Sequence, residues 1–496
     1  MIKDLPTEST ETLEPNPDGM TDVLTRIGYS LGEALADIID NSIDARAKHV
    51  VIQLHRTNAT ISRISIADDG CGMTPAHLSR VMQFGVRGEH RTPRLGKYGI
   101  GLKTASFSQC SAFTVISKSN GTVSARRWSF ALAKKGWKIE VVSEEAALKY
   151  WKRDWAPIRH DAPSGTIVVW DELQRLLAES EDLEAAIAKL RNKLRIELGM
   201  KFHRFIEAGK LRLFIRELSD AGASVPEPID ALDPFGYGGR PGRKGYPITF
   251  NLRLEGDIRL KAEAHIWPPK SQSPNYKLGS GAVVKRQGFY FYRNDRLIEA
   301  GGWHGHKSEE PHYSLARVRI DLPSELDAEF QLTVQKTGCK PPPEFLKGLQ
   351  AAKVGDTSFV DYLDAAQETY RNAPREQAEL PVPGRGLPKD VAAAIRKVIR
   401  AKHRGTKPRR ISFEWKSLAP VKVIEIDLGS STVILNSMYR SALVGKRSSV
   451  RSMAPFIALL FVNLQEYLAY ERTGKRVQQR EDEINAILAK VINPRS

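Results

Sequence analysis

Cysteine is scarce in this chain of 496 residues. Cys71, Cys110 and Cys339 stand far apart with no Cys-x-x-Cys, so neither a disulfide framework nor a cysteine zinc site is indicated. Long apolar runs are also missing, since the longest, 453–462, is too short to cross a bilayer and reads as a buried helix. The polar, acidic N-terminus does not resemble a signal peptide. We therefore expect a cytoplasmic protein with no membrane contact.

The composition is otherwise ordinary, except for its charge. Hydrophobic residues make up 41% and charged residues 27%, as in other soluble proteins, and the length allows about three domains. The net charge of +17 is unusual for such a chain. It indicates a polyanionic partner.

The first of three informative motifs is an acidic helix at 33–45. Asp37, Asp40, Asn41 and Asp44 recur at steps of three and four residues, which places them along one helical face. A carboxamide between carboxylates is a suitable site for Mg²⁺, which prefers a few oxygen ligands together with substrate phosphates. Taken alone, the same pattern also fits a solvated acidic surface.

The second motif is a strand that runs into a glycine turn. The strand at 64–68 ends on Asp68, which begins the motif Asp68-x-Gly70-x-Gly72-Met73. The glycines of this motif let another group approach the backbone closely. An Asp-Gly turn after a strand is common and has little meaning by itself.

The third motif is a glycine-rich loop at 96–106 that opens a helix. A Walker loop needs Gly-Lys-Thr in succession, but Leu102 separates Gly101 from Lys103, and a dinucleotide fingerprint needs glycine where Thr104 stands. What remains is a lid whose backbone N–H groups and following helix can hold phosphates, with Lys103 as a cation beside them.

In this order and spacing, the three motifs resemble those of the GHKL ATPases, the superfamily of gyrase B, heat-shock chaperones, MutL and sensor kinases. The resemblance is closest to the MutL and microrchidia (MORC) branches. Phe84-Gly85 before the loop, the run from Tyr98 to Lys103 within it, and Gly165-Thr166 at a later strand all follow that branch.

The resemblance implies roles for individual residues. Asn41 would bind Mg²⁺, Asp68 would accept a hydrogen bond from adenine, and Asp37 would activate water. Asp37 is one methylene shorter than the family's usual Glu, so slow turnover is expected. The further ATP-binding residues would be Gly70, Gly72, Met73, Gly96, Tyr98, Gly99, Ile100, Gly101, Leu102, Lys103, Thr104 and Thr166.

The resemblance also predicts an α/β fold with several domains. A tail or dimer strap (1–20) would precede a Bergerat-type α/β sandwich (21–225), a βαβ transducer-like domain (226–375) and a basic α/β domain (376–496). Strands are expected at 50–54, 64–68, 113–117, 165–170, 249–254, 261–267 and 288–298, and helices at 173–208.

The predicted second domain contains a further candidate residue. The run 330–337 resembles the strand end that brings a catalytic lysine to the γ-phosphate, which would be Lys336; an exposed loop lysine remains the alternative. A Pro/Gly-rich hinge is expected at 226–243. His304 and His306 have no third ligand nearby in sequence, so we expect them in a solvent loop rather than at a metal.

The last quarter of the chain carries most of the positive charge. From residue 381 onward there are 22 Lys and Arg against 9 Asp and Glu, a net charge of +13. Prolines 374, 381 and 383 indicate a linker, strands are expected at 421–427 and 432–436, and helices at 391–400, 448–470 and 476–492. We expect this segment to hold DNA phosphates.

The resemblance, together with the basic last quarter, predicts a Mg²⁺-dependent ATPase that closes as a dimeric clamp on DNA. A role in repair or in defence against foreign DNA is what the resemblance alone implies. A one-chain sensor kinase is not expected, because no histidine precedes Glu33. The alternative is an ATP-dependent conformational switch or chaperone acting on proteins.

Overall fold

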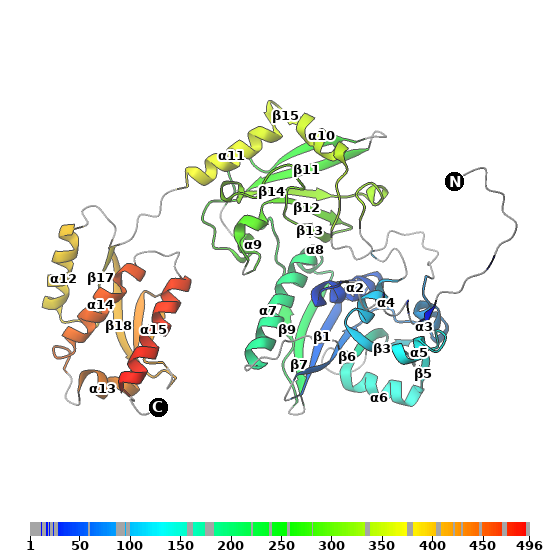
Figure 1. Ribbon diagram of the computed structural model, residues 1–496, viewed down its shortest axis with the longest axis horizontal. Helices are drawn as coiled ribbons and strands as arrows, with labels where there is room; N and C mark the ends of the chain where they lie inside the picture. Colours follow the sequence, from blue (N-terminus) through cyan, green and yellow to red (C-terminus); the bar gives the residue numbers. More distant parts are fainter. Residues whose placement is uncertain are drawn as a thin grey trace. The chain divides into compact units, whose positions relative to one another are not determined.

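The computed structural model divides into two compact units, residues 1–373 and 374–496 (Figure 1). It describes residues 28–57, 60–85, 95, 100–155, 162–173, 183–219, 222–237, 241–254, 258–279, 281–332, 338–373, 380–402, 408–419, 422–427, 430–445, 449–468 and 474–492, and isolated positions before residue 28. Most of the predicted strap at 1–20 therefore lies outside the described residues.

The first unit opens with a sheet that has nine strands among the described residues, in the order β5-β4-β3-β6-β2-β1-β7-β8, with β9 also on β7. Of the strand pairs in the described part of this sheet, only β1 and β7 run parallel. The expected strands at 50–54, 64–68, 113–117 and 165–170 are confirmed. The strands are β1 (His49–Arg56), β2 (Ile61–Asp68), β3 (Cys110–Ser119), β4 (Thr122–Ser129), β5 (Glu140–Val142), β6 (Gly165–Leu173), β7 (Arg212–Ser219), β8 (Gly222–Ala223) and β9 (Glu227–Ile229).

Helices cover both faces of this sheet. One face packs Ile52, Ile66 and Trp170 against α2, α4 and α7, while the other packs Ile167 against Trp151 of α6. The expected helical stretch at 173–208 is confirmed over α7 and α8. The helices are α2 (Leu31–Asp44), α3 (Pro75–Met82), α4 (Gly101–Phe107), α5 (Phe130–Ala133), α6 (Glu144–Trp155), α7 (Leu183–Lys201) and α8 (His203–Glu207).

A second sheet follows in the order β10-β11-β14-β12-β13. One face packs Phe250 and Phe289 against Phe345 of α10 and Phe359 of α11. The strands predicted at 249–254, 261–267 and 288–298 are confirmed, the last as a hairpin. The elements are β10 (Ile248–Arg253), β11 (Arg259–Ile266), α9 (Pro274–Lys277), η2 (Val283–Arg286), β12 (Gly288–Arg293), β13 (Arg296–Ala300), η3 (Pro311–Tyr313), β14 (Ala316–Asp321), η4 (Ser324–Leu326), α10 (Pro343–Ala351), β15 (Lys353–Val354), β16 (Thr357–Ser358) and α11 (Phe359–Arg371).

The connection between the parallel strands of this sheet differs from the predicted βαβ unit. β12 and β14 are parallel, and the stretch between them, described without a gap, contains β13 and the short η3 rather than an α-helix. The expected hinge also begins later than predicted, because β9 still pairs with β7. Phe330 and Gln331 form a turn instead of the expected strand.

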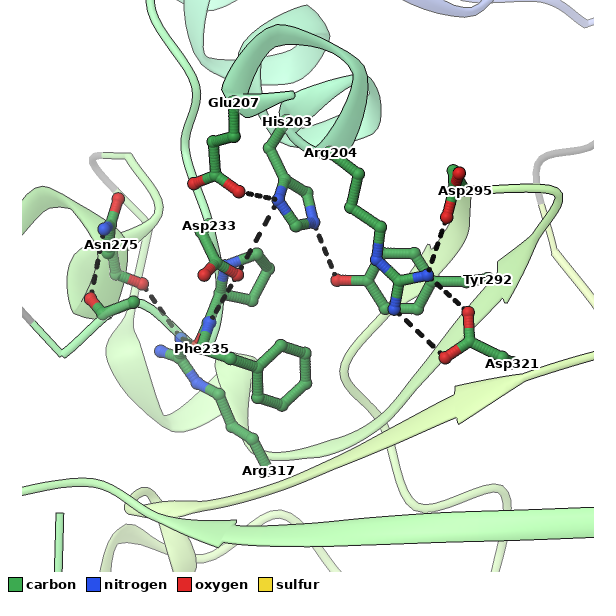
Figure 2. A network of polar contacts seen from close by, with 12 residues as sticks. His203, Arg204, Glu207, Asp233, Phe235, Asn275, Tyr292, Asp295, Arg317 and Asp321 are labelled. Carbon is green, nitrogen blue, oxygen red and sulfur yellow. Dashed lines mark hydrogen bonds and ion pairs between the residues drawn. The ribbon is translucent and has the colours of Figure 1, made fainter. Parts of the chain in front are cut away.

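Polar contacts join the second sheet to α8 of the first (Figure 2). The imidazole of His203 lies 3.0 Å from the hydroxyl of Tyr292. Arg204 pairs with Asp321 and Asp295, and its guanidinium lies 3.7 Å from the centre of the Tyr292 ring. Burial lowers the pKa of His203 to about 4. The imidazole in the His203–Tyr292 contact is therefore neutral at physiological pH. The β12–β13 hairpin is thus fixed against the part of the unit that is built on the first sheet.

The second unit contains a four-stranded sheet in the order β17-β18-β20-β19 among the described residues. Its core packs Phe413 and Val433 against Ile457 and Phe461 of α14. The expected strand at 432–436 and the expected helices are confirmed as β20, α12, α14 and α15, and the strand at 421–427 is confirmed over β19. The elements are β17 (Leu380–Pro383), α12 (Lys389–Lys402), β18 (Pro408–Lys416), β19 (Ile424–Asp427), β20 (Thr432–Asn436), η5 (Ser437–Tyr439), α13 (Arg440–Val444), α14 (Ala454–Leu468) and α15 (Gly474–Ile492).

The predicted linker at 381–383 is wrong, because these residues form β17. Val382 is buried, and the strand pairs in parallel with β18. Helix α12 forms the crossover that connects the two strands. Proline is compatible with an edge strand, where its missing N–H leaves no ladder partner unsatisfied. Among the described residues, no helix has both the length and the apolar character needed to traverse a bilayer.

Candidate active site

Helix α2 carries the acidic residues of the candidate site. A capping box fixes its first turn: the Ser30 hydroxyl accepts from the Glu33 N–H at 3.3 Å, and the Glu33 carboxylate accepts from the Ser30 N–H at 2.8 Å. Further along, Asp37 and Asp40 are 3% and 0% exposed, whereas Asn41 is exposed. The alternative of a solvated acidic surface is therefore wrong for Asp37 and Asp40.

The two buried carboxylates share an arginine from the second sheet. Arg296, at the start of β13, is 0% exposed; its Nε lies 2.9 Å from Asp40 and its terminal nitrogen 3.7 Å from Asp37. The hydroxyl of Tyr29 donates to the other Asp37 oxygen at 2.8 Å. Burial, and next the negative charge of Asp37, raise the pKa of Tyr29 above its usual value. Residue 296 falls within the strand expected at 288–298, but the sequence has no signal for its role.

Asp68 lies at the end of β2, in contact with α2. Its oxygens accept from the Ser42 hydroxyl and the Gly70 N–H, each at 2.9 Å, and Thr166 lies opposite it in the β2–β6 register. Burial raises the pKa of Asp68 to about 6. Asp68 is therefore a preorganised acceptor that is ionised at neutral pH.

The glycine turn after Asp68 brings its backbone against strands β3 and β6. Gly72 has a φ of +65°, and a Cβ there would overlap the carbonyl oxygen of Lys118. The next N–H, of Met73, donates to the Ser117 hydroxyl at 2.8 Å, and that hydroxyl lies 3.0 Å from the hydroxyl of Thr166. The motif residues Asp68, Met73 and Thr166 thus form one cluster. Ser117 also belongs to this cluster, and its only signal in the sequence is its place in a predicted strand.

Helix α4 begins beside Asp37. A Cβ on Gly101 would lie 3.6 Å from the Asp37 carboxylate. The hydroxyl of Thr104 donates into its own helix, to Ile100 at 3.1 Å. The start of the helix predicted to hold phosphates, with Ile100, Gly101 and Leu102, therefore adjoins the residue predicted to activate water.

Lys103 lies differently from the expectation of a cation beside the phosphates. It is 2% exposed, and its ammonium donates to the carbonyls of Val81 and Gln83 at 2.7 and 2.8 Å. These carbonyls end helix α3, so the side chain satisfies a helix C-terminus. Burial lowers the pKa of Lys103 to about 8.

Several predicted site residues fall outside the described part of the chain. These are Gly96, Tyr98 and Gly99 of the lid, and Lys336. Leu95, the described residue just before this loop, donates its N–H to Asp44 at the end of α2 at 3.0 Å.

His304 does not lie free in solvent, contrary to the prediction. Its side chain is 18% exposed and lies 3.1 Å from the Glu299 carboxylate. Glu299 also accepts from the N–H of Cys339 at 2.9 Å, and the three side chains come close enough to share an ion. The expectation that His304 has no further ligand groups nearby is wrong. Cys339 is distant in sequence but lies close to His304 and Glu299 in space.

The described residues fit a purine nucleotide with a divalent cation. At one end are a buried acceptor, Asp68, and a turn at Gly72 with no room for a side chain. Along α2 there are also the exposed carboxamide of Asn41, a ligand type that Mg²⁺ accepts, and Asp37, which lies beside the start of α4.

Comparison with known proteins agrees with this geometry. The family described as "Histidine kinase-, DNA gyrase B-, and HSP90-like ATPase" matches residues 29–153. Human ATPase MORC2 and mouse ATPase MORC2A are each 35% identical over 95 residues, 18% of this chain and 9% of the relative. The DNA mismatch repair protein MutL of Rhizorhabdus wittichii is 37% identical over 62 residues, 12% of this chain and 9% of that protein.

These alignments span about a tenth of each relative, and the match lies on α2, the first sheet and α4. The family match at residues 29–153 contains Asp37, Asn41 and Asp68, and it also contains helix α4. Residues 29–153 are therefore a GHKL-type ATPase domain.

Proposed function

We propose that this protein is a MORC/MutL-like ATPase that binds ATP with Mg²⁺, hydrolyses it slowly and uses the cycle to close a dimeric clamp on DNA. The observation that carries the ATP part is the buried Asp68 cluster near the C-terminal end of α2, with Asp37 and the start of α4 at the middle of the same helix.

The Asp68 cluster would recognise adenine. The ionised carboxylate accepts a hydrogen bond from the exocyclic amine, and the Ser42 and Gly70 donors hold it in position. Guanine presents a carbonyl oxygen at the corresponding place, so Asp68 would repel it. The close approach of Gly72 to the Lys118 carbonyl holds the turn after Asp68 in place.

Asn41 would hold Mg²⁺, which neutralises charge on the phosphates when bound. Asp37 would accept a proton from the attacking water. Its carboxylate already lies beside Gly101, where the terminal phosphate is expected. Lys336 is proposed as the γ-phosphate contact, as the resemblance implies. The role of Lys103 would be to support α3 beneath the lid.

DNA would bind through the second unit, whose residues 381–496 supply +13 of the net charge. Lys389 and Lys397 are exposed and lie eight residues apart on α12, which places them on one helical face with Ala393 between them. Lysines on such a face contact phosphates without reading sequence, so little base preference is expected.

One observation favours the alternative, a switch that acts on proteins. The second unit exposes apolar side chains on two helices, with Leu459 73% exposed on α14 and Val491 70% exposed on α15. Exposed apolar side chains are typical of protein-binding surfaces when they are contiguous.

The deciding experiment measures DNA binding and oligomeric state with no nucleotide, with ADP and with a non-hydrolysable ATP analogue. The clamp predicts dimerisation and salt-resistant retention of closed circular DNA only with the analogue. The clamp would be contradicted by DNA binding that is equal in all three conditions, or by no DNA binding in any of them. Absence of DNA binding together with nucleotide-dependent dimerisation would favour the protein-acting switch.

A further inference from the structure

The ion pair between β13 and α2 links the second sheet directly to the residue proposed to activate water. Arg296 is 0% exposed and lies within 4 Å of two carboxylates that are themselves 3% exposed or less, those of Asp37 and Asp40. Its guanidinium also lies 5.8 Å from the centre of the Phe202 ring. Two carboxylates one helical turn apart in a buried setting repel each other, and a cation between them offsets that repulsion.

From this we infer that Arg296 is a positioning residue for Asp37, and that hydrolysis depends on the β12–β13 hairpin being seated against α2. The inference rests on the proposed function, because it assigns a regulator to that same site. Arg296 touches neither the substrate nor the metal in this proposal; it holds the carboxylate that does the chemistry.

The hairpin has the connections that such a regulator needs. Tyr292 and Asp295 attach it to His203 and Arg204 of α8, and Arg296 follows directly after the tight Asn294–Asp295 turn, in which both residues have positive φ. A shift of the second sheet would therefore move Arg296 relative to Asp37. Misplacement of a catalytic group by about 1 Å costs roughly a hundredfold in rate.

The hairpin also supplies a matched control. Arg293 lies opposite Arg296 in the hairpin register and is nearly as buried. Its Nε donates to Asp327 at 2.8 Å, so this ion pair lies wholly within the second sheet's part of the unit. Arg293→Gln therefore removes a buried arginine pair from the same hairpin, one whose carboxylate, Asp327, does not belong to α2.

The experiment compares Arg296→Gln, Arg296→Lys and Arg293→Gln in the full chain, with two measurements. Without nucleotide, hydrogen exchange of α2 amides is followed by mass spectrometry. With ATP, kcat and KM are measured for each variant and for Asp37→Asn with and without Arg296→Gln.

We expect Arg296→Gln to accelerate exchange in α2, and to lower kcat by at least about tenfold at nearly unchanged KM, as misplacement of a catalytic group does. Arg296→Lys should recover part of the rate because it restores the charge. In the Asp37→Asn background, Arg296→Gln should have no further effect on kcat. Arg293→Gln should leave α2 exchange and kcat near those of the unaltered chain.

Three results would overturn the inference: α2 exchange unaffected by Arg296→Gln, equal losses from Arg293→Gln, or additive losses of Arg296→Gln and Asp37→Asn. Failure of the proposed function itself is separate, because an unaltered chain that binds no ATP would show it regardless of the exchange data. In that case an α2 effect confined to Arg296→Gln would still support the positioning contact.

Discussion

Asp68 is the residue whose chemistry is most sensitive to its surroundings. Burial raises its pKa to about 6, so the carboxylate is ionised at pH 7.5 and largely protonated at pH 5. The ionised carboxylate is the form that accepts from the adenine amine in the proposed contact. Adenosine, which has no phosphate to titrate, should therefore bind about tenfold more weakly at pH 5 than at pH 7.5.

The check is an NMR titration with adenosine at both pH values, with Asp68→Asn as the control. The amide does not titrate, so this variant should bind weakly and to the same extent at both values. Affinity of the unaltered chain that does not change with pH would argue against a carboxylate–adenine contact.

Gly72 is the residue at which the backbone admits no side chain. Gly72→Ala adds both a strained positive φ and an overlap with the Lys118 carbonyl, and we expect a loss of about 2–4 kcal/mol in unfolding free energy. Gly121→Ala is the control, because Gly121 also has positive φ (+81°) but nothing near the Cβ position. Equal losses in urea unfolding would mean that the close approach to Lys118 has no energetic weight.

At the same scale, the sequence predicted some site residues and not others. Asp68, Gly72 and Thr166 were predicted because they belong to a motif whose order and spacing are visible in the chain. Ser117 and Arg296 were not, because each reaches the site through tertiary packing from a strand that has no motif of its own. Lys103 belongs to the motif, yet its ammonium serves the α3 carbonyls.

Among the elements, α2 depends on its N-terminal cap. The Ser30 and Glu33 contacts satisfy two backbone N–H groups at the start of the helix that carries Asp37 and Asn41. Ser30→Ala should cost about 1 kcal/mol and weaken nucleotide binding only slightly, since Asn41 lies almost three turns away. Thermal unfolding followed by circular dichroism tests this, and a large loss of nucleotide affinity would show that the cap also shapes the pocket.

Elements with a clear period or a motif were predicted well, and those defined by pairing alone were not. Helix α2 and strands β1, β2 and β12 have buried faces that the sequence pattern shows directly. The two prolines of β17 predict a linker. The strand forms nevertheless, because it pairs in parallel with β18 and buries Val382. The connection between β12 and β14 is likewise a matter of long-range pairing, which local pattern cannot determine.

For the whole molecule, the uneven charge gives a prediction about DNA. If α12 contacts phosphates, affinity should fall with salt at a log–log slope of roughly −0.9 per contact. Reversing Lys389 and Lys397 to Glu should weaken binding to all sequences and reduce the slope by about two. These lysines are exposed, whereas Arg396 is only half-exposed, so the reversal should leave the fold intact.

Lys490→Glu is the control in a fluorescence anisotropy salt series, because Lys490 is exposed in the same unit but on α15. A similar change of slope for Lys490→Glu would mean that the charge acts in bulk rather than through α12. Unchanged binding in the Lys389/Lys397 variant would count against a phosphate-contacting α12.

The central claim is that α2 and the Asp68 turn form a Mg²⁺-dependent ATP site. Isothermal titration calorimetry with ATP, in Mg²⁺ and in EDTA, on the unaltered chain and on Asn41→Ala tests it most directly. We predict that Mg²⁺ tightens binding to the unaltered chain, and that this difference disappears in Asn41→Ala, because its carboxamide is the proposed metal ligand. An Asn41→Ala variant that keeps the full effect of Mg²⁺ on ATP affinity would contradict the account.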